Sequence, residues 1–470
     1  MEEMLYKFPD YNLLERENIE DNIDSIYKKQ EIEGFFKSFN VYIECNDIFY
    51  GINSVTYVIK LNPGTKLSKI KSYKQDLIMR FNAVDVEFEI SINGTGYLGI
   101  ILIKERKRTL KLGDLIGCTE FKTEKYKMPI ILGKDLKGNI CVEDLAQLPH
   151  LLIAGTTGTG KSTFLSTLII SILYKFNPNE LKLILVDTRA TNFLRFNKIP
   201  HLYIPVITNS NETEGVLINL INEMRHRYKL FEGKKVDNID EYNKISENKM
   251  PRLVLIIEDL YDLMMYTDKE VEQYIKVLTQ MSRAAGIHVV ISTQRPSINV
   301  ITGVIKSNIP ARMAFYVPSY IDSRTIIDKT GAEKLQVNGD IIFRKTGSEK
   351  DKRIQTPYIT DKEIEKIIEQ ISVNKISVGE ESTLKTSEEI INNNDKIDSK
   401  VYESDKPKEV MLKSNSITNV DNNVKEINVQ KIKNDEVNNT DEMQEKSSIF
   451  NKWWFWVLTA IFVSIIIVNL

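Results

Sequence analysis

The residues best suited to chemistry form one glycine-rich stretch, which reads Gly155-Thr156-Thr157-Gly158-Thr159-Gly160-Lys161-Ser162 and continues with Thr163. Glycines allow a backbone to turn tightly enough for successive N–H groups to face a chain of phosphates. In this pattern Lys161 would reach the β- and γ-phosphates, and the Ser162 hydroxyl would bind Mg²⁺. The stretch 155–163 therefore predicts a site for ATP and Mg²⁺. The alternative is a glycine-rich turn without a ligand.

A second candidate site is acidic. The apolar run 253–257 ends in Glu258 and Asp259. Beside a phosphate-binding loop, one such carboxylate holds the Mg²⁺ shell and the other polarises the attacking water. We assign Glu258 to the metal and Asp259 to the water, with Asp262 and Asp187 as the next candidates for the base. The alternative is that the two acids only cap the helix that follows the strand.

The elements that must position these sites alternate along residues 121–372. Strand-like runs are separated by helical segments and lie at 151–154, 181–187, 253–257, 289–293, 312–317 and 340–343. This alternation predicts an α/β fold with a mainly parallel sheet and helices on both faces. The glycine-rich loop follows the first of these runs, so it would lie at the carboxyl end of a central strand, where open α/β sheets bind ligands.

Residues 1–120 have a different pattern and predict a small α+β domain. Helical spacing extends over 12–39 and 67–81, and β-branched or aromatic runs lie at 41–44, 55–61, 84–92 and 97–103. The last two runs are joined through Asn93-Gly94, a typical hairpin turn. No residue of this unit is a catalytic candidate. The basic run 104–108 is better explained as a solvated strand end than as a nucleic-acid contact.

The end of the chain predicts a tether. Residues 373–450 follow a helix predicted at 361–371, are rich in Asn, Lys, Glu, Ser and Asp, and predict a disordered linker. The segment 451–470 carries no charge from Trp453 onward and begins with all three tryptophans of the chain. Such a segment predicts a transmembrane helix, hence a protein of the cell membrane with a single C-terminal anchor and a cytoplasmic motor domain. The alternative is a buried core helix.

Composition limits the partners. The chain has 470 residues, 42% of them hydrophobic, and a net charge of −2. Overall charge therefore gives no attraction to nucleic acid, and any DNA site must be a local patch. The three cysteines are widely spaced and form no CxxC pair, which is typical of a reduced, cytosolic chain. The first residues have no basic and apolar regions of a secretory signal.

Several further stretches resemble the FtsK/SpoIIIE family of DNA-pumping ATPases. With the phosphate loop they match it in order and spacing over about residues 5–360, and they lie at 132–135, 144–146, 149–152, 199–202, 223–230, 283–288, 293–297, 300–306 and 321–326. The resemblance implies that 1–120 is the ring-forming α domain and that 121–372 is the RecA-like β domain. It further implies a homo-hexamer that threads double-stranded DNA.

The resemblance also implies roles for individual residues. Arg283 matches an arginine that acts on the ATP of the neighbouring subunit, and Gln294 matches a polar sensor of the γ-phosphate. Arg295, Lys306 and Arg324 match positions that contact the DNA backbone, which carries affinity without sequence information. For each of these three basic residues the alternative is a structural ion pair.

Four departures from the family pattern are visible. The usual Asp-Glu order appears as Glu258-Asp259, which implies slow hydrolysis, and Tyr320 stands where a basic residue is common. No winged-helix domain follows residue 360, and the membrane segment is C-terminal. We predict a membrane-anchored DNA translocase for chromosome segregation, cell division or plasmid transfer. The alternatives are a conjugative coupling ATPase, a protein-secretion ATPase of the same superfamily, and a weakly catalytic ATP-binding scaffold.

Overall fold

The computed structural model describes residues 6–17, 28–90, 96–105, 108–266, 270–345, 347–348 and 350–376. Within these ranges no helix has the length and apolar character needed to cross a membrane. The predicted membrane segment at 451–470, almost all of the predicted linker at 373–450 and the predicted turn at Asn93-Gly94 lie outside them.

The smaller of two sheets is antiparallel, with the strand order β1-β2-β4-β3. Its strands are β1 (Ile43–Tyr50), β2 (Ser54–Leu61), β3 (Asp85–Ile90) and β4 (Leu98–Ile103). Three helices accompany them, α1 (Lys29–Ser38), α2 (Leu67–Ser72) and α3 (Lys74–Phe81). This unit is α+β, as its pattern predicts. The single helix predicted at 67–81 is wrong, because two helices meet at Tyr73, and the strand predicted at 41–44 continues to Tyr50.

The larger sheet has nine strands in the order β6-β5-β13-β12-β11-β7-β10-β9-β8. Their bounds are Pro129–Asp135 (β5), Ile140–Asp144 (β6), His150–Ala154 (β7), Leu181–Val186 (β8), Arg252–Ile257 (β9), Ile287–Thr293 (β10), Ala311–Ala314 (β11), Asp340–Arg344 (β12) and Lys352–Gln355 (β13). The neighbours from β11 to β8 are parallel, whereas those from β11 to β6 are antiparallel. The predicted α/β fold is confirmed, but a mainly parallel sheet is wrong.

Two of the four antiparallel pairings described in the larger sheet, β5 with β6 and β12 with β13, follow from the short connections between the paired strands. Four residues separate β5 from β6, and short connections join antiparallel neighbours, whereas parallel neighbours need long crossovers. The strands β5, β6 and β13 were not predicted. β13 is mostly polar, with the sequence Lys-Arg-Ile-Gln, and β5 contains Pro129 and Gly133, which are unusual in strands.

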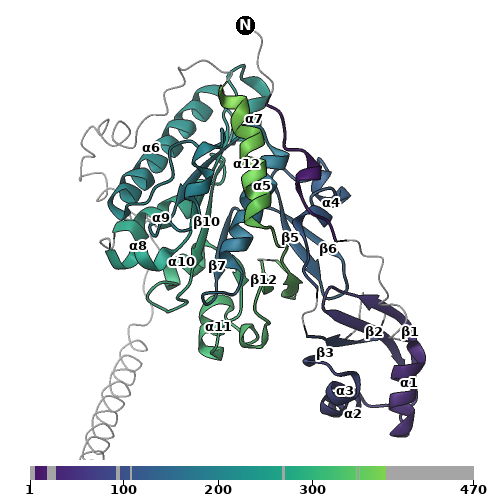
Figure 1. The fold of residues 1–470 in the computed structure, drawn as a ribbon. Coiled ribbons are helices and arrows are strands. Elements are labelled where there is room, and N and C mark those ends of the chain that lie inside the picture. The colour runs from purple at the N-terminus through teal and green to yellow at the C-terminus, as the bar shows by residue number, and fades with distance from the viewer. Residues whose placement is uncertain are drawn as a thin grey trace, which may run out of the picture. The chain divides into compact units, whose positions relative to one another are not determined.

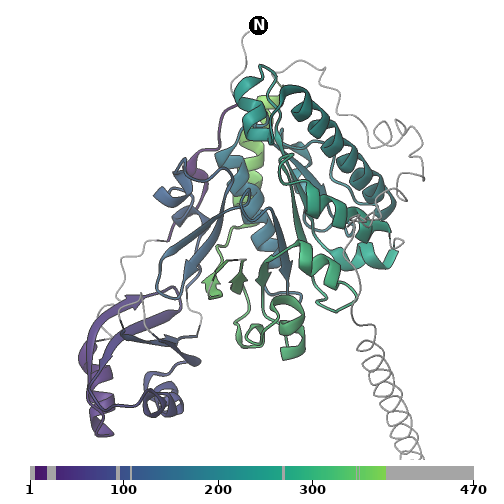
Figure 2. The same ribbon diagram turned by 180° about the vertical axis from the view of Figure 1, so that it is seen from behind.

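Helices cover both faces of the parallel part of this sheet (Figure 1; Figure 2 shows it from behind). One face packs against α5 (Lys161–Lys175) and α12 (Asp361–Ile376), and the other against α6 (Ser210–Lys234), α8 (Leu260–Tyr266), α9 (Glu270–Met281), α10 (Gly303–Asn308) and α11 (Tyr320–Ile327). Alternate residues of β9 enter different cores: Val254 faces α5, whereas Leu253 and Leu255 face α6. The apolar run of β9 is therefore buried on both sides, and the helices on both faces of the sheet are as predicted.

The remaining short elements connect this framework. They are α4 (Thr119–Lys122), α7 (Ile239–Ile245) and 3₁₀ turns at Tyr11–Leu13, Leu112–Asp114, Leu194–Lys198 and Ala332–Lys334. Leu14 packs in the core around α5, and the Tyr174 hydroxyl donates to the carbonyl of Asp10 at 2.9 Å, so the segment before α1 is attached to the larger sheet's domain.

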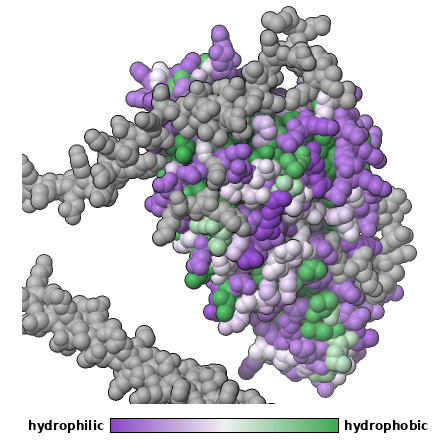
Figure 3. Space-filling view, turned by 60° about the vertical axis from the view of Figure 1, so that its left-hand side comes forward, coloured by the Kyte–Doolittle hydropathy of each residue, from purple (hydrophilic) through white to green (hydrophobic). Residues whose placement is uncertain are grey.

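On the face drawn in Figure 3, hydrophilic side chains predominate and hydrophobic ones form small scattered patches. The described residues thus place most of their apolar side chains in cores.

Three of the four histidines are buried. His201 donates from Nε2 to the carbonyl of Phe176 at 2.8 Å, and its Nδ1 has no hydrogen-bond partner among the described residues. Burial lowers the pKa of His201 to about 4, and it lowers those of His150 and His288 to about 3. These imidazoles are neutral in the folded protein, so a proton binds more tightly to the unfolded chain.

This difference predicts a loss of stability in mild acid. A lowered folded pKa means that stability is complete above the ordinary value of 6.5 and is lost as the pH falls toward 4. His201 alone accounts for about 2 kcal/mol between pH 7.5 and pH 5. His201→Gln, which keeps a donor for Phe176, should reduce the loss by about that amount in denaturant unfolding at the two pH values.

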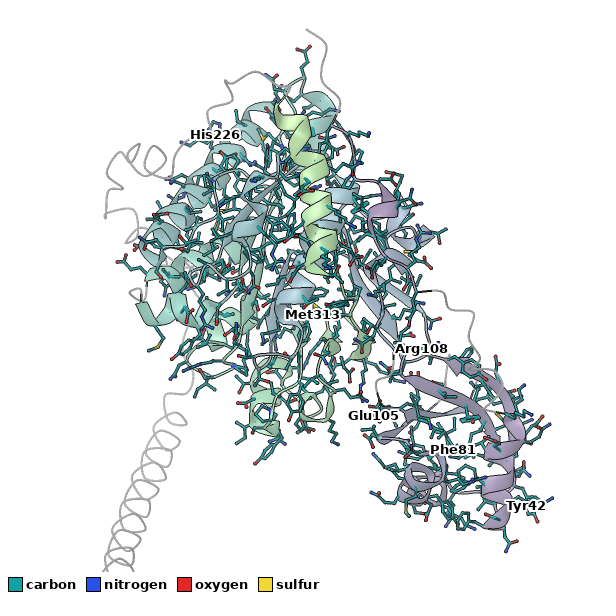
Figure 4. All side chains as sticks on the ribbon, viewed as in Figure 1. Tyr42, Phe81, Glu105, Arg108, His226 and Met313 are labelled. Atoms are coloured by element: carbon teal, nitrogen blue, oxygen red, sulfur yellow. The ribbon has the colours of Figure 1, made fainter. Side chains whose placement is uncertain are left out.

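A matched control is His226, which is exposed on α6 and lies at the outside of the structure in Figure 4. His226→Gln should leave the pH dependence of unfolding as it is in the parent protein. An equal loss of stability in His201→Gln and the parent would contradict the assignment of the acid sensitivity to the buried imidazole.

Candidate active site

The glycine-rich loop connects β7 to α5 in the backbone conformation that its residues predict. Gly158 and Gly160 have positive φ values of 78° and 109°, which side-chain-bearing residues rarely adopt. A Cβ on Gly160 would lie 2.9 Å from the backbone nitrogen of Gly339. That nitrogen donates to the carbonyl of Thr159 at 2.8 Å, so the segment before β12 braces the loop. The loop needs glycine for both conformation and space.

Lys161 begins α5 and is buried. Its Nζ donates to the carbonyl of Thr156 at 2.5 Å, inside the loop. Burial lowers the pKa of Lys161 to about 8, and the nearby carboxylates of Asp259 and Glu258 act against that shift. A buried ammonium group is costly unless an anion compensates for its lost hydration. Lys161 is therefore placed to favour a phosphate ligand.

Glu258 directly follows β9 and faces the loop. Its Oε1 accepts hydrogen bonds from the Ser162 hydroxyl at 2.9 Å and from the Asn192 side chain. Its Oε2 is buried and accepts no hydrogen bond from the described residues. Burial, with Asp187 nearby, raises the pKa of Glu258 to about 7. A hydroxyl beside a carboxylate with an unused buried oxygen fits Mg²⁺, which usually takes one or two protein ligands and completes its shell with phosphates and water.

The described part of the chain contains no cluster of three or more His, Cys, Asp or Glu side chains arranged for a metal ion. Our assignment of Mg²⁺ rests on Ser162 and Glu258 alone.

Asp259 is held from three sides. Its Oδ1 accepts from the backbone N–H of Tyr261 at 3.1 Å and lies 3.3 Å from the Thr293 hydroxyl. Its Oδ2 lies 3.1 Å from Nη2 of Arg189. Burial raises the pKa of Asp259, whereas the positive charge of Arg189 lowers it. The carboxylate is therefore fixed beside Lys161 by its strand end and by two neighbouring loops.

The two other candidates for the base, Asp262 and Asp187, already accept hydrogen bonds from other groups. Both carboxylate oxygens of Asp262 accept from Arg189, at 2.5 Å and 2.9 Å. Oδ2 of Asp187 accepts the backbone N–H groups of Asn192 and Phe193, which folds the loop after β8 back on itself. This geometry favours Asp259 over both as the group that polarises water.

Sequence reasoning missed Arg189 and Asn192 as site residues. Both lie in the loop after β8, and β8 is the parallel neighbour of β9. The carboxyl ends of adjacent parallel strands lie at the same edge of a sheet, so the polar run after residue 186 was the available signal.

Gln294 lies where a sensor of the γ-phosphate would be expected. It follows β10, which runs between β7 and β9, and its Oε1 accepts from the Thr157 hydroxyl of the phosphate loop at 2.7 Å. The structure therefore brings the loop, the acidic pair and Gln294 to one edge of the sheet.

Arg283 is at the opposite edge. It is exposed and precedes β10, whose seven residues separate it from Gln294 by about 20 Å. An arginine side chain cannot bridge that distance. Arg283 therefore cannot reach the phosphate loop of its own chain.

The three candidates for DNA contact lie on neighbouring elements. Arg295 is exposed in the loop after β10 and lies over the ring of Tyr261, with 4.4 Å from Cζ to the ring centroid. Arg324, in α11, lies over Tyr320 in a looser arrangement at 5.7 Å. Lys306, in α10, pairs with Asp328 at 3.1 Å. The ion-pair alternative is thus realised for Lys306, while the two arginines rest on tyrosine rings.

Comparisons with known proteins decide the family. The model of the FtsK alpha domain matches residues 8–102, and that of the FtsK/SpoIIIE family matches residues 111–298. The chain belongs to the FtsK/SpoIIIE family. It is 40% identical over 373 residues to "DNA translocase FtsK" of Clostridium tetani, an alignment that covers 77% of this chain and 50% of the relative.

A second relative, "DNA translocase SftA" of Bacillus subtilis, is 38% identical over 374 residues, which cover 78% of this chain and 39% of the relative. The chain thus spans about half the length, or less, of these curated relatives. Among solved structures, the pCW3 conjugation coupling protein TcpA, in a monomer form with ATPγS, matches with a TM-score of 0.52 and 24% identity. The match covers 73% of this chain and 99% of that one, and shows a shared fold.

The placement of Asp259 predicts a separation between nucleotide binding and hydrolysis. Asp259→Asn keeps an oxygen to accept from Tyr261 but removes the base, so ATP should still bind while hydrolysis falls by about 100-fold or more. Glu258→Ala should instead weaken Mg²⁺-dependent binding of ATP. The measurement is single-turnover hydrolysis of pre-bound ATP with duplex DNA present.

Asp262→Asn is the matched control, because it removes a carboxylate from the same helical turn without removing the proposed base. It should retain most of the parental rate. If Asp259→Asn hydrolyses ATP as fast as the parent, the acidic pair is a helix cap.

Proposed function

We propose that this chain is an ATPase that moves double-stranded DNA. The observation that carries the proposal is the single site formed by Lys161, Ser162, Glu258 and Gln294, in a chain whose family relatives are named DNA translocases. A motor that advances along any sequence needs contacts to the DNA backbone, which contribute affinity independently of sequence.

The site residues divide the chemistry between them. The N–H groups of the phosphate loop and Lys161 bind the phosphates, and Ser162 with Glu258 holds Mg²⁺. Bound Mg²⁺ would neutralise charge on the β- and γ-phosphates. Asp259 orients the attacking water and accepts its proton, and Gln294, next to Thr157, responds to the γ-phosphate.

The working form that we propose is a homo-hexameric ring. Arg283 supports this, because it lies at the edge of the sheet opposite the phosphate loop and is exposed. In a ring, Arg283 of one subunit would stabilise the transition-state charge at the ATP of its neighbour. Residues 1–120 would contribute to ring formation, and Arg295, Lys306 and Arg324 would line the DNA path.

Hydrolysis in the presence and absence of long duplex DNA tests the proposal. DNA should raise the steady-state ATPase rate several-fold, and Lys161→Ala should abolish both rates because it removes the charge that holds the phosphates. Hydrolysis that ignores duplex DNA would favour a protein-secretion ATPase. Nucleotide binding without hydrolysis under either condition would favour an ATP-binding scaffold.

We also propose that residues 451–470 anchor the motor in the cell membrane through the linker 373–450. The support is the sequence itself, with an uncharged segment that begins at Trp453. Such a tether fits a DNA motor that acts at a division site or at a plasmid-transfer channel.

Truncation after Glu445 tests the anchor. The truncated protein should move from the membrane fraction to the soluble fraction, because the uncharged segment is gone, while its ATPase rate stays unchanged. Sedimentation with membranes after truncation would show that the anchor lies elsewhere in the chain.

A further inference from the structure

Two side chains connect the expected DNA path to the acidic pair. Nη1 of Arg295 donates to the Tyr261 hydroxyl at 2.9 Å, and its guanidinium lies over the Tyr261 ring. Tyr261 is half-buried in the first turn of α8, whereas Arg295 is exposed. Tyr261 therefore sits between a solvent-facing cation and the interior of the site.

Tyr261 contacts Asp259 directly through its backbone, whereas Arg295 is connected to Asp259 through Thr293, which lies two residues earlier in the chain. The N–H of Tyr261 donates to Oδ1 of Asp259 at 3.1 Å. From the other side, the Thr293 hydroxyl and the N–H of Gln294 lie 3.3 Å and 3.4 Å from the same oxygen. Together with the Tyr261–Arg295 contact, these bonds close a ring that we call the Asp259–Tyr261–Arg295–Thr293 circuit.

The Thr293 hydroxyl can donate its proton to either of two acceptors, so this circuit has two possible hydrogen-bond arrangements. It accepts from the N–H of Arg295 at 3.2 Å and lies 3.4 Å from the carbonyl of Arg295 and 3.3 Å from Oδ1 of Asp259. A hydroxyl has one proton, so it can donate to Asp259 or to Arg295 but not fully to both. A shift of Arg295 therefore changes how tightly Asp259 is held.

A DNA phosphate would act on the exposed end of the circuit. Guanidinium groups bind phosphate through charge-assisted, often bidentate hydrogen bonds, which are stronger than a bond to a neutral hydroxyl. A phosphate next to Arg295 would thus compete with Tyr261 for its N–H groups and draw the loop after β10 toward the DNA.

We propose that Tyr261 is the positioning residue through which contact between Arg295 and the DNA backbone controls the placement of Asp259. The proposal rests on the proposed function and specifies how DNA regulates hydrolysis at that site. Tyr261 touches neither ATP nor water in this scheme and acts only by tying two loops together.

The test compares Tyr261→Leu with the parent in the full-length protein, using long linear duplex DNA of mixed sequence. Without DNA, the ATPase rate of Tyr261→Leu should rise toward the DNA-stimulated rate of the parent, because the contact with Arg295 that a DNA phosphate would break is already absent. Its affinity for duplex DNA at a fixed salt concentration should also be retained. The stimulation by DNA should fall to nearly nothing.

Tyr320→Leu is the matched control. Tyr320 lies under Arg324 as Tyr261 lies under Arg295, but among the described contacts none links Tyr320 to Glu258 or Asp259. This variant should keep the full stimulation. Tyr261→Phe, which keeps the ring and loses the hydroxyl, should lower the stimulation at least twofold, and it decides the question if Tyr261→Leu does not fold.

The outcomes separate this coupling from the proposed function. If duplex DNA does not change the ATPase rate of the parent, both the proposed function and the coupling through Tyr261 are wrong. A parent that responds, with Tyr261→Leu and Tyr261→Phe responding equally well, overturns the coupling alone. Loss of DNA binding in Tyr261→Leu also overturns it, because Tyr261 would then be part of the DNA contact itself.

Discussion

The structure depends on the burial of opposite charges at one edge of its larger sheet. Lys161, Glu258 and Asp259 are each no more than 4% exposed. The same loss of hydration lowers the pKa of the lysine and raises the pKa values of the two acids. Charges in such surroundings are tolerable only with partners in good geometry. The rest of the fold must therefore place these three side chains accurately relative to one another.

The strand order supplies this placement. β10 lies between β7 and β9, and all three are parallel, so their carboxyl ends bring the phosphate loop, Gln294 and the acidic pair together. The strands hold this register because alternate apolar side chains are buried in two separate cores. β8 lies at the edge of the sheet next to β9, and the loop that follows it carries Arg189, which pairs with Asp259. The antiparallel strands from β12 to β6 lie beyond β11 and bring Gly339 against the phosphate loop.

A feature could be predicted from the sequence when all of its residues lie in one continuous stretch. The phosphate loop is one continuous stretch, and the acidic pair ends one apolar strand, so both could be identified without a structure. Arg189 and Tyr261 could not be identified in this way, because their roles depend on contacts with residues far away in the sequence. Tyr261 in sequence is simply an aromatic residue in the first turn of a helix, and only the fold places Arg295 against it. The mixed sheet was missed for a related reason, since β13 has almost no apolar pattern.

The reversed acidic order makes the contacts of Asp259 more important than they would be for a longer side chain. Glu258 gains one methylene, about 1.5 Å of reach, and its Oε1 meets the Ser162 hydroxyl directly. Asp259 loses the same length, and a misplacement of about 1 Å can cost roughly a hundredfold in rate. A short carboxylate has few rotamers with which to correct its position, so the water-polarising geometry is set by the two loops that hold its oxygens. In the mechanism that we propose, the order Glu258-Asp259 therefore makes the rate depend on the loops after β9 and β10, which hold Asp259, and the loop after β10 carries Arg295.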